Sequence, residues 1–504
     1  NMGVMVPCHE VLAKAKEVGA DVVGLSGLIT PSLEEMQYVA AEMEKDAHFR
    51  ERSIPLLIGG ATCSRVHTAV KIAPHYSGPV VYVPDASRSV SVAQSLIGDG
   101  RVQFVAELAA DYERVRQQHA SKKQVPLWSL DRARANKWQP TAQAVTDTGA
   151  QASAHATAAT ASPADDSAAW AGYTPPRPKF TGRRVFKNYD LADIARYIDW
   201  GPFFQTWDLA GPYPAILSDE VVGEEATRVF ADAQAMLKKI IDGRWLTANA
   251  VVGIWPANRV GHDDIALYAD ESRSQVALTW HGLRQQTEKQ EYVDDNGHTR
   301  LRPSRCLADF VAPAEDKNTI ADKSINESDE GQISLNVPDY AGMFAVTTGI
   351  GADKKDAQFL AAHDDYSSIL FKALADRLAE AFAELMHHKV RTDFWGYAPD
   401  EALPVDDLIA EKYRGIRPAP GYPACPDHTV KRNMFEVLGC ADIGMSLTDS
   451  LAMSPAASVS GFYLSHPEST YFNVGKIGQD QLTDMAKRRD MPEDELRRWL
   501  QPNL

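Results

Sequence analysis

The residues with the clearest capacity for chemistry lie in a short stretch rich in proline and glycine, residues 413–426, which reads YRGIRPAPGYPACP. Repeated prolines and glycines neither propagate a helix nor fit a central strand, so this stretch is predicted to be a stiff, irregular loop. Loops of this kind usually present backbone groups to ligands. Arg417 lies within it and can offer a planar fork of N–H donors to a carboxylate.

Acidic residues recur at helical spacing ahead of this loop. Asp376, Glu380 and Glu384 are four residues apart in a segment predicted to be a helix, residues 370–390. The apolar residues of the same segment form a separate stripe: Leu374, Leu378, Phe382 and Met386. The acidic stripe has two interpretations, a set of carboxylates for a cationic ligand group or an ordinary solvated helix face. Spacing alone favours the solvated face.

The first part of the chain, residues 1–112, alternates between helical and strand patterns. The predicted elements are helix 11–18, strand 22–25, helix 33–45, strand 54–58, helix 64–72, strand 80–83 and helix 89–96. Regular alternation of this kind indicates a parallel sheet covered by helices on both faces. The fold class expected here is therefore α/β, of the Rossmann-like or flavodoxin-like type.

Small and hydroxylated residues follow the predicted strands. They include Ser26, Thr30, Gly59, Gly60 and Ala86. Ligands of open parallel sheets bind outside the carboxyl ends of the strands, and small residues let a large flat ligand approach the backbone. The alternative is that the glycines only make turns. Spacing alone leaves both interpretations open.

The rest of the chain divides into a linker and a second domain. Residues 113–172 lose the alternating pattern, and the Ala-, Thr- and Ser-rich part, 141–169, is interpreted as flexible, with an Ala-rich helix as the alternative. A proline cluster at 175–178 marks the entry to a domain at 173–504, whose mixed helix and strand signals favour an α+β fold. The polar, acidic insert 315–332 is expected to be a surface loop.

Composition excludes several classes of protein. The formal net charge of -16 argues against a general partner for nucleic acid or anionic membranes. No stretch is long and apolar enough to span a bilayer, and the start lacks an export signal. The 5 cysteines are scattered, which fits the reducing cytoplasm. The pair His387-His388 and the string 425–428 lack the spacing of a metal site, and none is predicted.

Several motifs, in order along the chain, resemble those of cobalamin-dependent methionine synthase. The segments that carry the resemblance are 4–7, 25–32, 57–62, 82–87, 197–207, 379–384, 394–399, 413–426, 458–462 and 465–467. The resemblance implies the C-terminal part of that enzyme: a cobalamin-binding domain truncated at its N-terminus, a long linker, and an α+β reactivation domain with an antiparallel sheet. It implies S-adenosylmethionine and cobalamin (as methylcobalamin) as the bound groups.

The resemblance also assigns residues to the S-adenosylmethionine site. Asp199 and Glu380 are expected to contact the amino group of the ligand. Arg417 and the adjoining loop backbone are expected to hold its carboxylate and adenine. Tyr471 and Phe472 are expected to flank the site, where the family commonly has two tyrosines, so contacts through the second hydroxyl are lost here.

For cobalamin, the resemblance implies that Ser26 and Thr30 bind the dimethylbenzimidazole tail, that Gly59-Gly60 line its slot, and that Ala86 lies against the corrin. The family's Asp-x-His-x-x-Gly motif, which supplies the axial ligand of cobalt, does not occur in this sequence. The nearest string surrounds His48, which has Glu51 in place of the glycine and is expected to lie on the surface. We therefore expect weak or no cobalamin binding by this chain alone.

The activity implied for the family is methyl transfer from 5-methyltetrahydrofolate to homocysteine through cobalamin. The barrel domains that bind folate and homocysteine, the latter with zinc, are absent from this sequence. The part present is expected to serve the reductive methylation of cob(II)alamin, with a flavodoxin-type reductase and the missing N-terminal domains as partners. The alternative is a stand-alone module that binds S-adenosylmethionine or docks a redox partner without catalysis.

Overall fold

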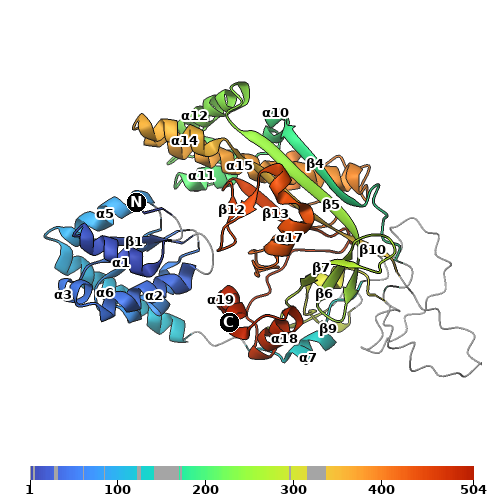
Figure 1. Cartoon of the computed structure of the whole chain (residues 1–504), viewed down its shortest axis with the longest axis horizontal. Coiled ribbons are helices and arrows are strands. Elements are labelled where there is room, and N and C mark those ends of the chain that lie inside the picture. The colour runs from blue at the N-terminus through green and yellow to red at the C-terminus, as the bar shows by residue number, and fades with distance from the viewer. Residues whose placement is uncertain are drawn as a thin grey trace, which may run out of the picture. The chain divides into compact units, whose positions relative to one another are not determined.

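The structure is a computed structural model that describes residues 2–3, 6–27, 32–60, 62–84, 86–121, 126–140, 170, 173–293, 297–314 and 337–504. Thr30, the predicted flexible stretch 141–169 and the insert 315–332 lie outside these ranges. The chain forms two compact units: unit 1 is Asn1–Leu127 with Asp490–Leu504, and unit 2 is Trp128–Arg489. Each unit is described by itself below (Figure 1).

Unit 1 alternates strands and helices along the chain. Its elements are α1 (Cys8–Glu17), β1 (Val23–Ser26), α2 (Ser32–Lys45), α3 (Ala47–Arg52), β2 (Leu56–Gly59), α4 (Arg65–His67), η1 (Thr68–Ile72), η2 (Ala73–His75), β3 (Val80–Tyr82), α5 (Ala86–Ile97), α6 (Arg101–Ser121), α19 (Glu493–Leu500) and η7 (Gln501–Asn503).

The three strands of unit 1 form a parallel sheet in the order β1-β2-β3. Apolar residues of β1 and β2 pack with the buried side of α2, where Met36, Val39, Ala40 and Met43 point into the same core. The predicted alternation and the parallel pairing are thus confirmed. The assignment of this unit to a cobalamin-binding fold stays a prediction.

Unit 2 contains a large antiparallel sheet flanked by helices. Its elements are α7 (Leu130–Ala135), β4 (Gly182–Tyr189), α10 (Leu191–Ala195), α11 (Gly201–Thr206), η3 (Ala215–Ser218), α12 (Gly223–Asp242), β5 (Thr247–Val260), β6 (Asp264–Tyr268), β7 (Val276–His281), β8 (Glu291–Val293), β9 (Thr299–Leu301), η4 (Leu307–Phe310), β10 (Asp339–Ile350), α14 (Ala352–Ala361), α15 (Asp365–Lys389), η5 (Val390–Phe394), α16 (Val405–Ile409), α17 (Lys431–Leu438), η6 (Cys440–Ile443), β11 (Ser446–Leu447), β12 (Met453–Ser454), β13 (Ser458–Tyr463) and α18 (Gln479–Arg489).

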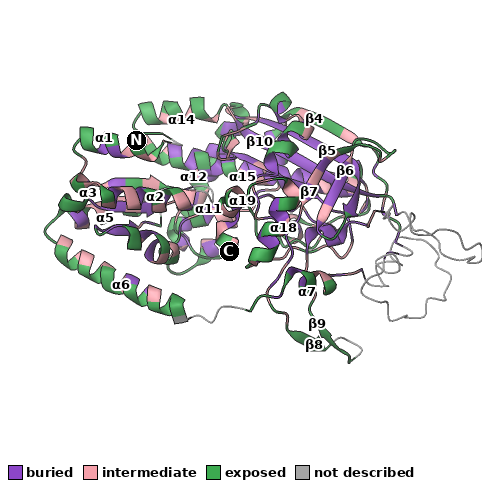
Figure 2. Cartoon of the chain, turned by 60° about the horizontal axis from the view of Figure 1, so that its bottom comes forward, coloured by how far each residue is buried: buried purple, intermediate pink, exposed green. Residues whose placement is uncertain are grey.

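The sheet of unit 2 runs in the order β13-β10-β5-β6-β7, and neighbouring strands along this order are antiparallel. The long strand β5 pairs with β10 on one side and, on the other, with β4 along its first half and β6 along its last residues. Figure 2 shows β5 and β10 as buried elements of this unit. The predicted α+β class with an antiparallel sheet is confirmed for unit 2.

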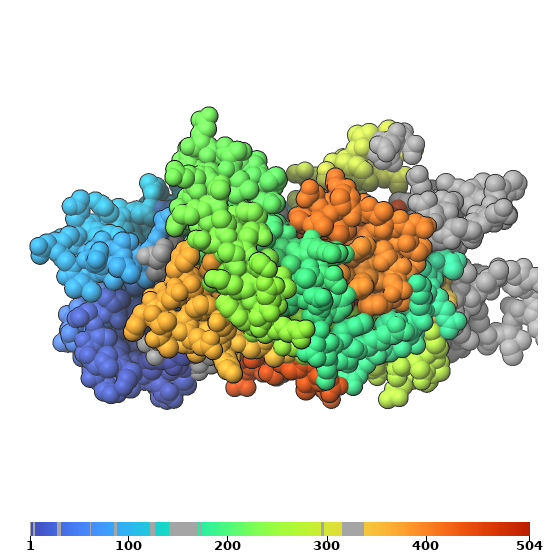
Figure 3. All heavy atoms as spheres, turned by 90° about the horizontal axis from the view of Figure 1, so that it is seen from above, coloured from blue at the N-terminus to red at the C-terminus, as the bar shows by residue number. Residues whose placement is uncertain are grey.

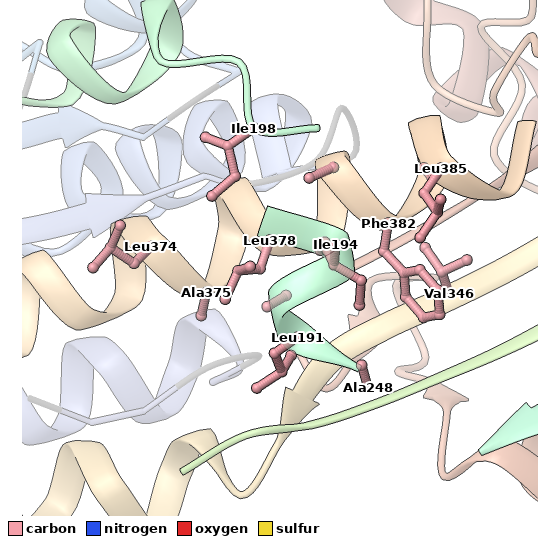
Figure 4. Close-up of a cluster of buried hydrophobic side chains, with 14 of the residues drawn as sticks. Leu191, Ile194, Ile198, Ala248, Val346, Leu374, Ala375, Leu378, Phe382 and Leu385 are labelled. Atoms are coloured by element: carbon pink, nitrogen blue, oxygen red, sulfur yellow. The ribbon is translucent and has the colours of Figure 1, made fainter. Parts of the chain in front are cut away.

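Alternate residues of the central strands serve two different cores. On β10, Phe344 and Val346 belong to the core that includes α15, whereas Met343 and Ala345 belong to the core that includes α17. This follows from the strand geometry, because successive side chains point to opposite faces of a sheet. Figure 4 shows Leu378 and Phe382 of α15 beside Ile194 of α10 and Val346 of β10.

Segments distant in sequence meet on the α15 side of unit 2. Helices α10, α11, α12 and α14 all contact α15. Figure 3 shows the residues of α12 next to those of α14 on one face of the molecule. Helix α15 is therefore the central support of this layer.

The described residues of the stretch 113–172, which was predicted to be one linker, include parts of both units. Helix α6 continues to Ser121, and the residues from Trp128 to Trp138 belong to unit 2. Trp138 packs against Phe310 at a centroid distance of 5.0 Å. Arg134 pairs with Asp263 at 2.7 Å and with Asp484 at 2.8 Å. These contacts join residues far apart in sequence, so local composition could not reveal them.

The end of the chain also departs from the predicted domain boundary at 504. Residues Asp490–Leu504 group with unit 1, and α19 buries Leu496, Trp499 and Leu500. None of the helices within the described ranges is long and apolar enough to cross a membrane.

Candidate ligand-binding site

The stretch 413–426 is an irregular loop, as predicted, that is fastened to the end of β13. Ile416 and Leu464 exchange two backbone hydrogen bonds of 3.0 Å, and Phe462 N donates to the carbonyl of Pro418 at 2.8 Å. Gly421 has φ +97° and its N–H donates to the carbonyl of Cys425 at 2.8 Å. Backbone pairing with the edge strand β13 and with Leu464, which follows it, explains why this proline-rich segment has a fixed shape.

Arg417 extends from this loop toward the last turns of α15. Its Nη1 lies 2.7 Å from Glu384 Oε2, donates to the Tyr413 hydroxyl at 2.9 Å, and lies 3.4 Å from His387 Nδ1. Its backbone N–H donates to the Tyr471 hydroxyl at 2.9 Å. The side chain of Arg417 is 21% exposed, so this cation lies at the boundary between the core and the solvent.

His387 is a neutral member of this cluster. It is fully buried, and burial together with the charges of Arg391 and Arg417 holds its pKa well below the usual range. An arginine only donates hydrogen bonds, so Nδ1 of His387 accepts and Nε2 carries the proton. That proton points to the Tyr397 hydroxyl, 3.4 Å from Nε2. Metal ligation by His387 is disfavoured because both ring nitrogens are engaged.

A second arginine, Arg391, lies close to Glu384. Arg391 is fully buried and donates from Nε and Nη2 to the carboxylate of Glu401, with distances between 2.8 and 3.0 Å. Its Nη2 lies 3.7 Å from Glu384 Oε1, and its guanidinium lies 4.2 Å from the ring centroid of Tyr413. Two arginines and two glutamates therefore balance each other's charge, which burial of such groups requires.

Comparison with known proteins identifies the family to which this chain belongs. A family model described as the vitamin B12-dependent methionine synthase activation domain matches residues 190–490, more than half of the chain. The chain belongs to this family. A similar solved structure is the crystal structure of the MetH reactivation domain bound to AdoHcy, with 45% sequence identity. The match covers 75% of this chain and 99% of that chain, with a TM-score of 0.61.

Of the predicted site residues within 190–490, Glu380 lies on α15 itself and the others lie on three further segments of the chain. Glu380 lies one helical turn before Glu384 on α15, and its negative charge is the main cause that raises the pKa of Tyr422 in the loop. Tyr471 is half-buried and contacts the backbone of Arg417, as described above. Phe472 packs on Phe310 at a centroid distance of 6.5 Å. The fold thus brings Glu380, Arg417 and Tyr471 to one region.

Asp199 is placed less directly. It lies between α10 and α11, both of which contact α15, and Figure 4 shows its neighbour Ile198 beside that helix. Within the described residues, the hydrogen bond of Asp199 is local, since Oδ1 accepts from the backbone N–H of Gly201 at 2.9 Å. Its predicted role toward the ligand stays a prediction.

Sequence reasoning assigned no role to Glu384, His387 or Tyr413 at the site. Glu384 was noticed as part of the acidic stripe, yet its burial distinguishes it from Asp376, which is exposed. The available signal was the i, i+4 spacing from Glu380, which places both carboxylates on one side of the helix. Which of the two pairs with Arg417 depends on where the loop crosses α15.

In unit 1, the described members of the predicted cobalamin set lie at the carboxyl ends of the strands. Ser26 ends β1 and is exposed, Gly59 ends β2, Gly60 follows it, and Ala86 begins α5. Gly27 N donates to the carbonyl of Gly59 at 2.8 Å, and a Cβ on Gly60 would clash with the backbone of Gly27. Close packing of the chain on itself therefore accounts for Gly60 without a ligand.

The described residues of unit 1 fit cobalamin only in part. His48 lies on α3, where its Nε2 is 3.3 Å from Arg52 Nη1, and not at a strand end. Within the described ranges of the whole chain, no group of three or more His, Cys, Asp or Glu residues is arranged to hold a metal ion. We therefore derive no chemical step through cobalt from this chain.

Proposed function

We propose that the activation-domain region binds S-adenosylmethionine beside the loop 413–426 and presents it as a methyl donor. The observation that carries this proposal is the convergence of Arg417, Glu380 and Tyr471 from three separate segments. Arg417 is a fixed cation, and Glu380 is close enough that its negative charge interacts with both Arg417 and Tyr422. An amino-acid ligand needs this combination of a cation for its carboxylate and a carboxylate for its ammonium group.

Each residue has a definite task in this proposal. Arg417 pairs with the ligand carboxylate, Glu380 and Asp199 hold the ammonium group, and the loop backbone with Tyr471 and Phe472 borders the adenine. The sulfonium is itself a good leaving group, so the protein contributes placement and orientation, not acid or base catalysis. The similar solved structure supports the proposal, because it is bound to AdoHcy, which differs from S-adenosylmethionine by one methyl group.

We further propose that this donor site serves the reductive methylation of cobalamin within a methionine synthase, a 5-methyltetrahydrofolate–homocysteine methyltransferase. Membership in the B12-dependent family supports this reaction. The electron would come from a flavodoxin-type reductase, and the cobalt ligand from domains outside this chain. Ser26, Gly59 and the start of α5 would border the cofactor in unit 1.

Calorimetric titration of S-adenosylmethionine and AdoHcy into the full chain tests the donor site. We expect binding by the parent and about 100-fold weaker binding by Arg417→Ala, because two charge-assisted hydrogen bonds to the carboxylate are lost. Arg417→Lys is the matched variant, since it keeps the charge but not the planar fork, and an intermediate affinity is expected. Equal affinities of the parent and Arg417→Ala, or no binding by a folded parent, would contradict the proposal.

A further inference from the structure

The guanidinium of Arg417 is held at one of its three nitrogens. Glu384 Oε2, the Tyr413 hydroxyl and His387 Nδ1 all approach Nη1, at 2.7, 2.9 and 3.4 Å. Across the described part of the chain, Nε and Nη2 form no hydrogen bond. Nε and Nη2 are the two donors of one edge of the guanidinium, and such an edge receives a carboxylate in a bidentate pair.

Glu384 is itself kept in a fixed position. Its side chain is 7% exposed, and it lies on the long helix α15 between two core residues, Ala383 and Leu385. Its Oε1 is buried, forms no hydrogen bond, and lies 3.7 Å from Arg391 Nη2, which Glu401 holds in turn. Arg417 therefore pairs with Oε2 of this carboxylate, and Arg391 places a second positive charge near Oε1.

We propose that Glu384 and Tyr413 are positioning residues, which hold Nη1 of Arg417 so that its Nε–Nη2 edge is free for the ligand carboxylate. This inference rests on the proposed function and adds residues that the sequence assigned to no contact. An arginine has four side-chain torsions, and a side chain that is already fixed loses less freedom when the ligand binds. Glu384 then acts on affinity through Arg417 and touches no ligand atom.

The test compares two ligands, S-adenosylmethionine and an analogue that lacks the α-carboxylate, by calorimetry on the full chain. Glu384→Ala should weaken S-adenosylmethionine binding about tenfold, the magnitude of one charge-assisted hydrogen bond. The same variant should bind the analogue as the parent does. Glu384→Gln keeps an oxygen acceptor and the side-chain volume at this position, so it should restore most of the affinity for S-adenosylmethionine.

Two further variants keep the inference falsifiable. Tyr413→Phe removes one hydroxyl, which accepts from Nη1 and also lies 3.3 Å from the Tyr471 hydroxyl. It should also weaken S-adenosylmethionine binding more than binding of the analogue, even if Glu384→Ala fails to fold. Glu380→Gln, one turn earlier on α15, should weaken both ligands, because Glu380 faces the ammonium group in the proposed site. Equal losses for both ligands in Glu384→Ala and Tyr413→Phe, or no loss in either, would overturn the positioning role.

The outcomes separate this inference from the proposed function. If the parent does not bind S-adenosylmethionine, the donor site itself is refuted. If the parent binds and Glu384→Gln is as weak as Glu384→Ala for both ligands, Glu384 contacts the ligand's positive charge directly and is not a positioning residue.

Discussion

Gly60 illustrates, at the scale of a residue, how backbone geometry determines an amino-acid type. Its φ is +106°, in the region that side chains rarely adopt, and a Cβ there would meet the backbone of Gly27. Gly27 in turn accepts from Thr62 N at 3.3 Å through its carbonyl. The crossing of these two strand ends therefore leaves no room for a side chain.

We predict that Gly60→Ala destabilises unit 1 by at least about 2 kcal/mol, from a disfavoured φ and a backbone clash. Gly100→Ala is the matched control, because a Cβ there would meet nothing within 4 Å and its φ is not positive. Urea unfolding, monitored by hydrogen exchange of the backbone amides in β1 and β2, measures the effect. Equal midpoints for the two variants would show that the close approach is not rigid.

The residues around Arg417 show how the charge state of a side chain depends on the groups that surround it. His387 stays neutral because it is buried between two cations, whereas Arg417 stays charged because Glu384 compensates it. The same histidine on the surface would be an ordinary titrating group.

Among the elements of unit 2, helix α15 has the central role, because it carries both a core face and the site residues Glu380 and Glu384. Its apolar stripe packs on the sheet and on α10, while Glu380 and Glu384 emerge toward the loop 413–426. The N-cap Asp364 accepts from Ser367 N at 3.0 Å, which fixes where the helix starts. The positions of both glutamates thus depend on how firmly the stripe is packed.

We predict that Leu378→Ala lowers the free energy of unfolding of unit 2 by about 2–5 kcal/mol, because it opens a cavity in a fully buried position. Ile369→Ala on the same helix is the control. Ile369 is 48% exposed, so its truncation should cost less than about 1 kcal/mol. Urea unfolding followed by tryptophan fluorescence measures both, and similar costs for the two variants would contradict the observed orientation of α15.

At the scale of the whole molecule, unit 2 contains several buried or partly buried histidines whose pKa is lowered. Burial is the largest cause that lowers the pKa of His428 and of His466 to about 3, and it also holds the pKa of His387 far down. Below the ordinary histidine pKa of about 6.5, these histidines bind protons in the unfolded chain but not in the folded chain. Stability from these groups is therefore lost as pH falls from about 6.5 toward 3. Asp339 acts in the opposite direction, because burial raises its pKa to about 7.

A single substitution isolates the histidine contribution from the opposing groups. His466→Gln should reduce the slope of unfolding free energy against pH, between about pH 4 and 6, by about 1.4 kcal/mol per pH unit, one proton's worth. Tryptophan fluorescence suits this measurement, because all of the 10 tryptophans except Trp499 lie in unit 2. His363→Gln, at an exposed position of unit 2, is the control and should leave the slope unchanged. An unchanged slope in His466→Gln would show that His466 titrates freely.

The local features of this protein could be predicted from its amino-acid sequence. Alternating hydrophobic periods located β1, β2 and β3 with their helices, because each period reports one buried face. The prolines and glycines of 413–426 identified a rigid loop with Arg417 inside it, since those residues exclude regular structure. The family was recognisable from the order of such motifs, and the match over residues 190–490 confirms it.

Which of these features contact one another depends on the folded chain and could not be predicted from local sequence. Trp128–Trp138 belongs to unit 2 because Arg134 and Trp138 find partners far along the chain, a fact that composition does not carry. Similarly, Glu384 and not Glu380 pairs with Arg417, although both have the same spacing on α15. The choice depends on where a loop tied to β13 crosses a helix, and a contact between distant segments is a property of packing that no local pattern contains.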